Sequence, residues 1–553
     1  NVAVGMEAGY AITTGIQNTL IGANAGDALT ASDNNVAVGV GALGSDTLGN
    51  RNVAIGTSAL FNQNFTTATS AYNVAVGHKA GISVSTGSLN TLMGGLTGDA
   101  LTTGTTNTAV GTQALTADTA GNRSVAIGNA ALFVQNFSTS TNAYNVAVGY
   151  EAGAAVTTGI SNTLIGGLAG DALTDADSNI AIGVNALTTD TLGSTSVAIG
   201  QDALSTQNFT TATNTYNVAV GHSAGAGNTT GIRNEFIGGL AGYSNTTGSN
   251  NVGIGLSSLE GNTVGSKSIA IGTNALALQN PATATDMYNI AIGHGAGDSV
   301  TTGKFNTIIG PLAGDSLQDD DHNVMIGYAS GTAAQSDNNV FVGGSSGANV
   351  STGAGNVCIG SSAGNSTVLL TTGGSNVIIG LNARTVANST DNSIVIGEAV
   401  TGVGSNNFTF GTGTTDSNIA HGATTITAPS DERYKENIAN SSAGLSFIND
   451  LRPLTFQSKK EKDVPSDHRA YVADSDKRVM NSNGETNHGF IAQEVKTAID
   501  NHAELKDGFD MWSEEVADGE GGRQRVAPAA LIPMLVKAIQ ELSAEIETLK
   551  SGG

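Results

Sequence analysis

The sequence predicts a mainly β protein: a long, repetitive parallel β-solenoid or β-roll, followed by a smaller α+β domain that ends in a coiled-coil helix. Three observations lead to this prediction. A five-residue motif recurs through residues 1–422, the composition changes abruptly near residue 429, and apolar residues near the C-terminus follow a heptad spacing. We therefore expect a shaft at 1–422, a linker at 423–429 and a second domain at 430–553.

The repeat in the first region is regular enough to define a coil length. Asn1–Gly5 has the sequence Asn-Val-Ala-Val-Gly, and the same or a closely related motif begins again at residues 18, 35, 52 and 73. These steps of 17, 17, 17 and 21 residues recur, so a super-repeat of 72 residues starts at 1, 73, 145 and 217. From residue 289 onward the steps are irregular. Such a period is typical of a solenoid whose coils stack on one another.

Each motif alternates like a short strand, with Val2 and Val4 on one face and Ala3 on the other. A strand this short cannot bury its apolar face alone. Stacked about 4.8 Å apart, about 25 such strands would build a continuous core and a rod on the order of 120 Å long. The alanine allows a second backbone to approach, the closing glycine suits a corner, and the leading asparagine can form a ladder with its counterparts in adjacent coils.

Every fourth step carries four additional residues that include an aromatic residue and precede a tyrosine. The phenylalanines are Phe65, Phe137 and Phe209. One interpretation makes these segments receptor-binding loops that offer the phenylalanines to a glycan. The other makes them structural corners in which the phenylalanine caps the core and the tyrosine bonds to the next coil. Aromatic residues at fixed repeat positions usually pack, which favours the structural corner.

The composition excludes several classes of partner. The net charge is -24, and only seven of the 22 Lys and Arg residues precede residue 429, so neither nucleic acid nor an anionic membrane surface is expected as a partner. No apolar stretch approaches the roughly 18 residues of a membrane span. Cys358 is the single cysteine, and Asp319–Asp321 lack the spaced ligands of a calcium loop, so we expect no disulfide framework, no metal and no cofactor.

Residues 430–553 have ordinary globular composition and predict helices and strands. Ser430, taken alone, has the character of a helix N-cap with acidic residues in the first turn. An amphipathic helix is expected from Leu445 until Pro453, followed by a strand, and a strand or turn at His488 leads into another helix. A terminal helix at about 529–550 carries an a/d seam, formed by Leu535, Ile539, Leu542, Ile546 and Leu549. A seam this short requires oligomerisation or packing on the domain.

The two regions resemble two known families. Residues 1–422 resemble the β-roll head domains of trimeric adhesins, whose repeats also alternate small and β-branched residues before a glycine, and similar repeats occur in phage fibres. Residues 430–553 resemble the C-terminal intramolecular-chaperone domain of endosialidases and of many phage tail fibres and spikes. The motifs that carry this second resemblance are Ser430, Asp431, Arg433, Lys435, Asn437 and Ile438; Gly489, Ile491, Ala492, Gln493 and Glu494; and the closing segment 530–542.

The second resemblance implies a homotrimeric chaperone that folds and aligns the fibre and then cuts itself off. Carried over residue by residue, Ser430 would be the nucleophile and Lys435 the general base, with the Pro429–Ser430 bond as the scissile bond. A serine hydroxyl needs a neighbouring base, and a lysine serves once it is buried. A spacing of five places the two residues on different faces of a helix, so we expect a turn at this motif. The reaction would be a single-turnover autoproteolysis, and no turnover enzyme is expected in the solenoid.

These observations together predict a phage tail fibre for host attachment. The expected partners are two further copies of the chain, a host cell-surface receptor that is a glycan or an outer-membrane component, and other virion tail proteins bound through a region before Asn1. The expected location is the virion exterior, after synthesis in the host cytoplasm. The alternatives are a glycan-depolymerising tailspike, a fibre of a contractile injection system, and a bacterial trimeric adhesin. A glycosidase needs a pair of carboxylates in a shaped cleft, which the near-uniform solenoid does not offer.

Overall fold

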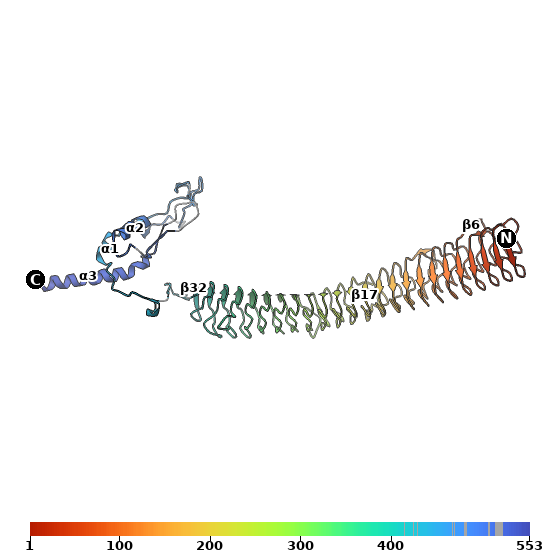
Figure 1. Cartoon of the computed structure of the whole chain (residues 1–553), viewed down its shortest axis with the longest axis horizontal. Helices are drawn as coiled ribbons and strands as arrows, with labels where there is room; N and C mark the ends of the chain where they lie inside the picture. The colour runs from red at the N-terminus through yellow and green to blue at the C-terminus, as the bar shows by residue number, and fades with distance from the viewer. Residues whose placement is uncertain are drawn as a thin grey trace. The chain divides into compact units, whose positions relative to one another are not determined.

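The computed structural model describes residues 1–553 except 414, 424, 429, 467, 469, 481–483, 507–508, 515–523 and 553. The chain divides into two compact units, Asn1–Pro429 and Ser430–Gly553. The first is a parallel β-solenoid and the second is a smaller α+β unit with a C-terminal helix, so the predicted fold class is confirmed (Figure 1).

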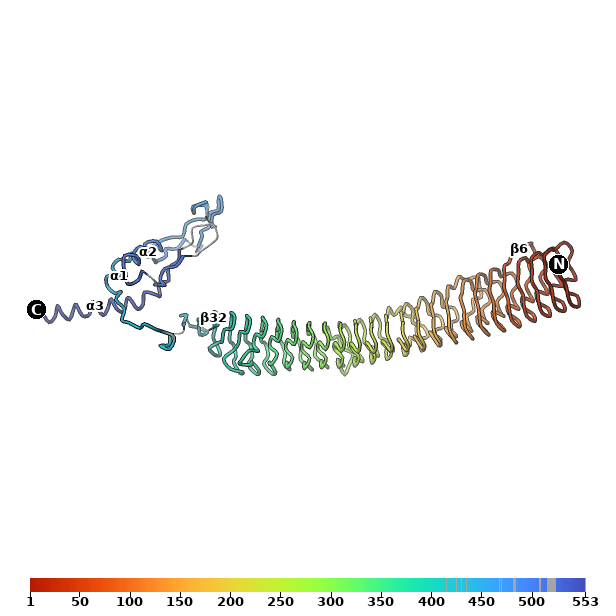
Figure 2. Tube along the Cα trace, viewed as in Figure 1, coloured from red at the N-terminus to blue at the C-terminus, as the bar shows by residue number. Residues whose placement is uncertain are grey.

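The solenoid is built on one long sheet, to which each coil contributes one short strand (Figure 1). Figure 2 shows the successive coils of the chain stacked on one another. Within the described residues this sheet has 25 strands, and neighbouring strands are parallel up to β32, which pairs antiparallel with β33. The strands are β1 (Val2–Val4), β2 (Thr19–Ile21), β3 (Val36–Val38), β5 (Val53–Ile55), β7 (Val74–Val76), β8 (Thr91–Met93), β9 (Thr108–Val110), β11 (Val125–Ile127), β13 (Val146–Val148), β14 (Thr163–Ile165), β15 (Ile180–Ile182), β17 (Val197–Ile199), β19 (Val218–Val220), β20 (Glu235–Ile237), β21 (Val252–Ile254), β23 (Ile269–Ile271), β25 (Ile290–Ile292), β26 (Thr307–Ile309), β27 (Val324–Ile326), β28 (Val340–Val342), β29 (Val357–Ile359), β30 (Val377–Ile379), β31 (Ile394–Ile396), β32 (Asn407–Thr412) and β33 (Thr415–Ala420).

The four-residue extensions add a second, shorter layer of pairing. In each of the four super-repeats, a two-residue strand of the extended coil pairs parallel with one of the preceding coil. These pairs are β4 (Gly49–Asn50) with β6 (Thr69–Ser70), β10 (Gly121–Asn122) with β12 (Thr141–Asn142), β16 (Gly193–Ser194) with β18 (Thr213–Asn214), and β22 (Gly265–Ser266) with β24 (Thr285–Asp286).

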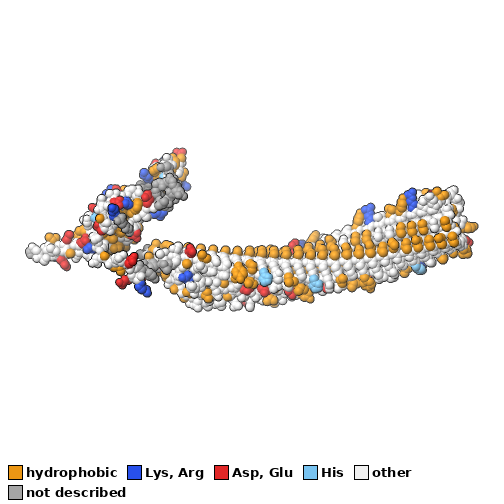
Figure 3. Space-filling view, in the orientation of Figure 1, with side chains coloured by type: hydrophobic (Ala, Val, Ile, Leu, Met, Phe, Trp, Pro, Cys, Tyr) orange, Lys and Arg blue, Asp and Glu red, His pale blue; other side chains and the backbone are white. Residues whose placement is uncertain are grey.

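From β2 to β31, the middle residue of each three-residue strand points inward, and the two flanking residues point outward. Ala147 and Ala219 are fully buried, whereas the flanking Ile127 and Ile237 are each 38% exposed. The interior of the coil is therefore narrow, and the middle residues of the strands, most of them alanine, fill it. The last residues of these three-residue strands are all valine, isoleucine or methionine and form one continuous apolar row along the outside of the shaft. The first residues form a second row, which is mostly valine and isoleucine but is interrupted by Thr19, Thr91, Thr108, Thr163, Glu235 and Thr307. We call these the outer rows (Figure 3).

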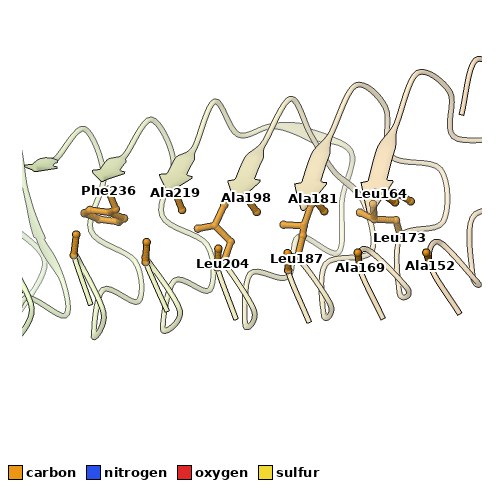
Figure 4. Packing of buried hydrophobic residues seen from close by; sticks show 14 of the residues in the cluster. Ala152, Leu164, Ala169, Leu173, Ala181, Leu187, Ala198, Leu204, Ala219 and Phe236 are labelled. Atoms are coloured by element: carbon orange, nitrogen blue, oxygen red, sulfur yellow. The ribbon is translucent and has the colours of Figure 1, made fainter. Parts of the chain in front are cut away.

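Larger inward side chains occupy space that is left by glycines on the facing turns. Where the strand carries Phe236, a Cβ on Gly225 would lie 3.0 Å from the ring and a Cβ on Gly242 would overlap it. Where the strand carries Ala198, the facing turn supplies Leu204 instead (Figure 4). The interior is thus filled by complementary sizes, as close packing requires. From residue 306 onward, where the steps are irregular, the inward residues are larger and include Ile308, Met325 and Phe341.

The leading asparagines form the expected ladder, but the principal donor is the backbone rather than a second side-chain amide. The backbone N–H of Asn35 donates to Oδ1 of Asn18 at 2.9 Å, and that of Asn52 donates to Oδ1 of Asn35 at 2.9 Å. The Nδ2 group of Asn35 donates to the carbonyl oxygen of Gly49 at 2.9 Å, across the coil. The ladder asparagines from Asn18 onward are buried, so each side chain joins two coils and closes its own.

In three of the four super-repeats, a buried aspartate of the preceding coil organises the extended coil; these residues are Asp46, Asp118 and Asp190. In the second super-repeat, Asp118 accepts hydrogen bonds from the N–H groups of Gly121 at 3.0 Å and Phe137 at 3.2 Å, and from the amide of Gln135 at 2.7 Å. Burial raises the pKa of Asp118, and these hydrogen bonds lower it in part. In the fourth super-repeat Asn262 replaces the aspartate and Pro281 replaces the phenylalanine, so the loss of an acceptor coincides with the loss of a donor.

The second unit consists of short elements around one small core. They are the 3-10 helices η1 (Glu432–Tyr434), η2 (Glu461–Asp463) and η3 (Pro528–Leu531), the α-helices α1 (Leu445–Asp450), α2 (Ala492–Asn501) and α3 (Ile532–Ser551), and the antiparallel pairs β34 (Leu454–Phe456) with β35 (Asn487–Gly489) and β36 (Trp512–Glu514) with β37 (Gln524–Val526). Phe447 of α1, Val495 and Ile499 of α2, and Met511 fill the core. No helix in the described parts of the chain is long and apolar enough to cross a membrane.

Part of the predicted linker at 423–429 folds back on the shaft. Thr427 pairs with Asn418 of β33 through two backbone hydrogen bonds, both of 2.8 Å. The chain is therefore tied to the solenoid to within three residues of Ser430.

The corner glycines generate the first prediction. Gly166 has φ +136°, and a Cβ at this position would lie 2.5 Å from the carbonyl oxygen of Gly183 in the next coil. We expect Gly166→Ala to destabilise the shaft by about 1–3 kcal/mol, because it combines strained backbone with a backbone clash. Gly167→Ala is the control, since nothing lies within 4 Å of its Cβ position. Equal denaturant midpoints for the two variants would contradict this account of the corner.

The carboxylate network generates the second prediction. We expect Asp118→Asn to destabilise the shaft by about 1–3 kcal/mol, because an amide has one acceptor oxygen for the donors that the carboxylate serves. Adding Phe137→Pro removes one donor, as in the fourth super-repeat. The double variant should therefore be less destabilised than the sum of the two single variants, measured from unfolding midpoints. Strictly additive effects would show that the two positions are not coupled.

Candidate functional site

Ser430 and Lys435 approach each other at the start of the second unit. The chain forms the single turn η1 and leaves it at Lys435, whose backbone is extended with φ -122° and ψ 141°. Its N–H donates to the carbonyl oxygen of Glu432 at 3.0 Å. The side chain then returns across the turn, and its Nζ donates to Oγ of Ser430 at 2.7 Å. This is the turn that the five-residue spacing predicts, in place of a continuous helix.

The neighbouring motif residues shape this turn. Asp431 caps η1 by accepting the N–H of Arg433 at 2.9 Å, and its carboxylate forms an ion pair with the Arg433 guanidinium at 2.6 Å. That guanidinium lowers the pKa of Asp431. Asn437 has φ 56°, a left-handed conformation that asparagine tolerates better than most residues. Asp431 and Arg433 bond to each other and not to the Ser430–Lys435 pair, so we assign them to the fold of the turn.

The geometry suits nucleophilic chemistry, but one chain supplies only part of what it requires. The serine hydroxyl and the lysine amine are within hydrogen-bond distance, as a nucleophile and its general base must be. Both side chains are solvent-exposed in the single chain, whereas a lysine base has to be desolvated enough to be neutral. Pro429, the other side of the predicted scissile bond, lies outside the described residues.

The second motif spans the end of β35 and the start of helix α2, and it ties α2 to the segment before β34. Gly489 pairs with Leu454, and a Cβ on Gly489 would lie 3.2 Å from the ring of Phe456. Glu494 accepts a two-pronged hydrogen bond from Arg452, with 2.9 Å between Nε and Oε2, and this guanidinium lowers the pKa of Glu494. Gln493 is exposed and lines a shallow groove with Phe456 and Gln524. These contacts are structural and do not involve Ser430 or Lys435.

Two interactions that link distant parts of this unit were not apparent from the sequence. Gly444 precedes α1 and has no side chain to cap it, and the carboxylate of Glu541 on α3 accepts the N–H of Leu445 at 2.7 Å. This hydrogen bond lowers the pKa of Glu541. His502 lies edge-on to Phe447 and bonds to Asp450 at 2.9 Å and to Glu504 at 3.2 Å. The hydrogen bond to Asp450 is the main cause that raises the pKa of His502.

Helix α3 has two apolar faces, and among the described residues only one of them packs against the rest of the unit. Ala538 is buried and Met534 packs against the core of the unit. The predicted seam lies on another face, where every member is between 42% and 77% exposed; its members are Leu535, Ile539, Leu542, Ile546 and Leu549.

In the predicted receptor loops the phenylalanine side chains are buried, so they are not available to contact a ligand. Phe65, Phe137 and Phe209 are only 7%, 6% and 7% exposed. Their rings are buried in the extended coil, and the backbone N–H of each donates to the buried aspartate of the preceding coil. The burial of these three rings favours the structural-corner interpretation over the receptor-loop interpretation. The exposed aromatic residues of the extension are instead the tyrosines that follow, because the left-handed backbone at Tyr72 and Tyr144 turns the side chain outward.

A comparison with protein families identifies one match in this chain. Residues 430–504 match the family described as chaperone of endosialidase. The match includes both the Ser430–Asn437 turn and the Gly489–Glu494 motif, and it ends before α3. No curated protein and no solved structure matches the chain.

Proposed function

We propose that this chain is the subunit of a homotrimeric phage tail fibre, in which residues 430–553 direct trimer assembly and then separate from the shaft by self-cleavage at Pro429–Ser430. The observation that carries the proposal is the 2.7 Å contact between Lys435 and Ser430 at the first residue of a unit that matches the chaperone of endosialidase. A solenoid shaft of the kind described here is suited to reach from a virion to a host surface.

Two unpartnered apolar surfaces support the association of several copies. The outer rows run along the whole shaft, and members such as Ile127 and Ile165 remain 38% and 37% exposed. The seam on α3 is exposed over more than three turns. Exposed apolar surface of this extent on a monomer marks an interface. The outer rows would join the copies in the shaft, and the seam would join the same copies in the second unit.

The proposed cleavage is an intramolecular acyl transfer followed by hydrolysis. Oγ of Ser430 attacks the carbonyl carbon of Pro429, and Lys435 accepts the hydroxyl proton and delivers it to the departing amide nitrogen of Ser430. The resulting ester joins Pro429 to the serine side chain. Water cleaves that ester, which leaves a carboxylate on Pro429 and restores the hydroxyl of Ser430. Assembly of the copies would provide the desolvation that the exposed lysine lacks in a single chain.

The self-cleavage proposal predicts a change in mass. The expressed wild-type chain should yield fragments 1–429 and 430–553, and Ser430→Ala should remain at full length. Ser442→Ala is the control, because this exposed serine lies in the same segment and should leave cleavage intact. Mass spectrometry of the denatured proteins measures all three. Full-length wild type, or cleavage that persists in Ser430→Ala, would overturn the proposed chemistry.

The assembly proposal predicts that the seam is required for trimers. Ile539→Asp places a carboxylate in the seam, where burial between copies would be strongly unfavourable, so we expect monomers by native mass spectrometry. Gln540→Asp adds a carboxylate at the next, exposed position of the same helix and should still form trimers. To separate assembly from cleavage, both substitutions are made in the Ser430→Ala background. Trimers that survive Ile539→Asp would show that the seam does not join the copies.

A further inference from the structure

A single outward-facing position on the solenoid gathers most of its positive charge and four of its tyrosines. This position is the residue immediately before each buried ladder residue, and it lies in the left-handed conformation in coil after coil. Only seven Lys and Arg residues occur in 1–429, and four of them stand here. We call it the cation–tyrosine column; its aromatic and basic members are Arg51, Tyr72, Arg123, Tyr144, Tyr216, Arg233, Lys267, Tyr288, Phe305 and His322.

Within the column the cations lie over the tyrosine rings. The Arg51 guanidinium is 5.3 Å from the centre of the Tyr72 ring, and its N–H donates to the tyrosine hydroxyl. In the next super-repeat Arg123 lies 5.4 Å from the Tyr144 ring and bonds to its hydroxyl at 2.7 Å. Tyr72 and Tyr144 are nevertheless 47% and 50% exposed. Each pair therefore presents a flat ring and a guanidinium to solvent together.

The third super-repeat distinguishes two explanations of the cation: that it only supports the tyrosine ring, or that it forms part of a binding surface. Thr195 replaces the arginine in the coil before Tyr216, so the supporting contact seen in the first two super-repeats is absent here. A cation is still present, because Arg233 occupies the column in the coil after Tyr216 and is exposed. A need to support the tyrosine from one side does not account for this exchange. A need for one cation beside each exposed tyrosine does.

The fourth super-repeat shows the same column with its charge compensated. Lys267 lies 5.1 Å from the Tyr288 ring, but it also forms an ion pair with Asp286 at 2.7 Å. The aromatic surface is larger here, since Tyr288 stacks on Phe305 at 5.6 Å and Phe305 on His322 at 4.9 Å. The column cations whose charge is not compensated by a carboxylate therefore belong to the first three super-repeats.

Exposed hydroxyl groups lie close to the column in the sequence of each extended coil. The four-residue extension that precedes each tyrosine exposes Thr66, Thr67 and Ser70 in the first super-repeat. Figure 3 shows basic side chains standing above one edge of the shaft, separate from the outer rows. Flat rings, guanidinium groups and hydroxyls side by side are the groups that bind sugar rings and sugar carboxylates.

We propose that the cation–tyrosine column binds an acidic polysaccharide along the shaft, with a sugar ring on each tyrosine and a carboxylate on the neighbouring cation. One tyrosine recurs every four coils, so the binding positions lie about 19 Å apart. This sparse charge fits a polymer with one carboxylate per oligosaccharide repeat. A densely charged chain such as nucleic acid would instead meet the acidic remainder of the shaft. The inference deepens the proposed role in host attachment and rests on it for its biological meaning.

The test uses gellan fragments, a linear bacterial glycan with a single glucuronate in each repeat, and the same fragments after chemical reduction of the carboxyl groups. The full chain should bind immobilised gellan, and the reduced, neutral form should bind more weakly. Replacing Arg51, Tyr72, Arg123 and Tyr144 with serine should weaken binding of gellan roughly tenfold or more, because two of the repeated positions are lost. Serine is compatible with the backbone, since Ser161 and Ser178 occupy the same column with φ 62° and 58°.

A matched pair of double variants separates the column from the surface at large. Arg123→Ser with Tyr144→Ser removes one column pair, whereas Lys79→Ser with Tyr150→Ser removes a cation and an exposed tyrosine elsewhere on the shaft. Only the first should weaken gellan binding. Immobilised polyphosphate, a densely charged polymer without sugar rings, serves as a second probe. The proposal would be overturned if the wild type did not bind gellan, if the two double variants lost gellan binding equally, or if the wild type bound polyphosphate as strongly as gellan. Native mass spectrometry of the same samples reports the trimer independently, so a failed glycan site is distinguishable from a failed fibre assignment.

Discussion

The buried asparagine ladder is the interaction on which the rest of the shaft depends. Each ladder side chain accepts an N–H from the following coil and donates across its own coil, as Asn18 does for Asn35 and Ser32 at 2.9 and 2.7 Å. A buried amide left without partners costs more than the hydrogen bonds themselves contribute, so the ladder tolerates only one register between coils. That register places the alanines inside, the outer rows outside and the tyrosines in one column. Where serine replaces asparagine, as at Ser124, the amide of Gln135 donates to its hydroxyl at 3.0 Å and accepts from Asn145 at 2.8 Å, which keeps the network closed.

The repeat predicts the coil and the single parallel sheet, because the period of the motif is the length of one turn of the chain. The direction in which the strand faces is harder to predict, because valine and alanine are both apolar and the alternation alone does not say which is inside. The structure resolves this through size: a narrow coil admits alanine at most positions, and a larger residue such as Phe236 requires glycines on the facing turns. The same limit explains the phenylalanines of the extensions. Their spacing predicts an aromatic residue at each corner, but only the local backbone decides that Phe137 turns in and Tyr144 turns out.

At the candidate site the sequence predicts what is local and misses what is distant. The Ser430–Lys435 contact spans one turn: the resemblance to the chaperone domain implies the pair, and the spacing of five predicts that it lies in a turn rather than on one face of a helix. The hydrogen bond by which Glu541 caps Leu445 joins residues 96 positions apart, and no local sequence pattern predicts it. The only signal is a negative one, since Gly444 begins a helix without any side chain to cap it. His502 is similar, because its partner Asp450 belongs to another helix and the pair is brought together by the packing of Phe447.

A shaft of near-identical coils raises a problem of alignment that the second unit is suited to solve. The outer rows repeat with every coil, so copies displaced by one coil would meet almost the same apolar surface, and a flat repetitive sheet specifies register weakly. The seam on α3 ends after a few turns and has no equivalent displaced position, so it can fix the chains at one end before the shaft associates. Cleavage after assembly would then remove the seam that aligned the chains. The assembled shaft would be protected by the slowness of its unfolding rather than by an equilibrium with free chains. In this view the regularity of the shaft is what makes a separate, removable chaperone necessary.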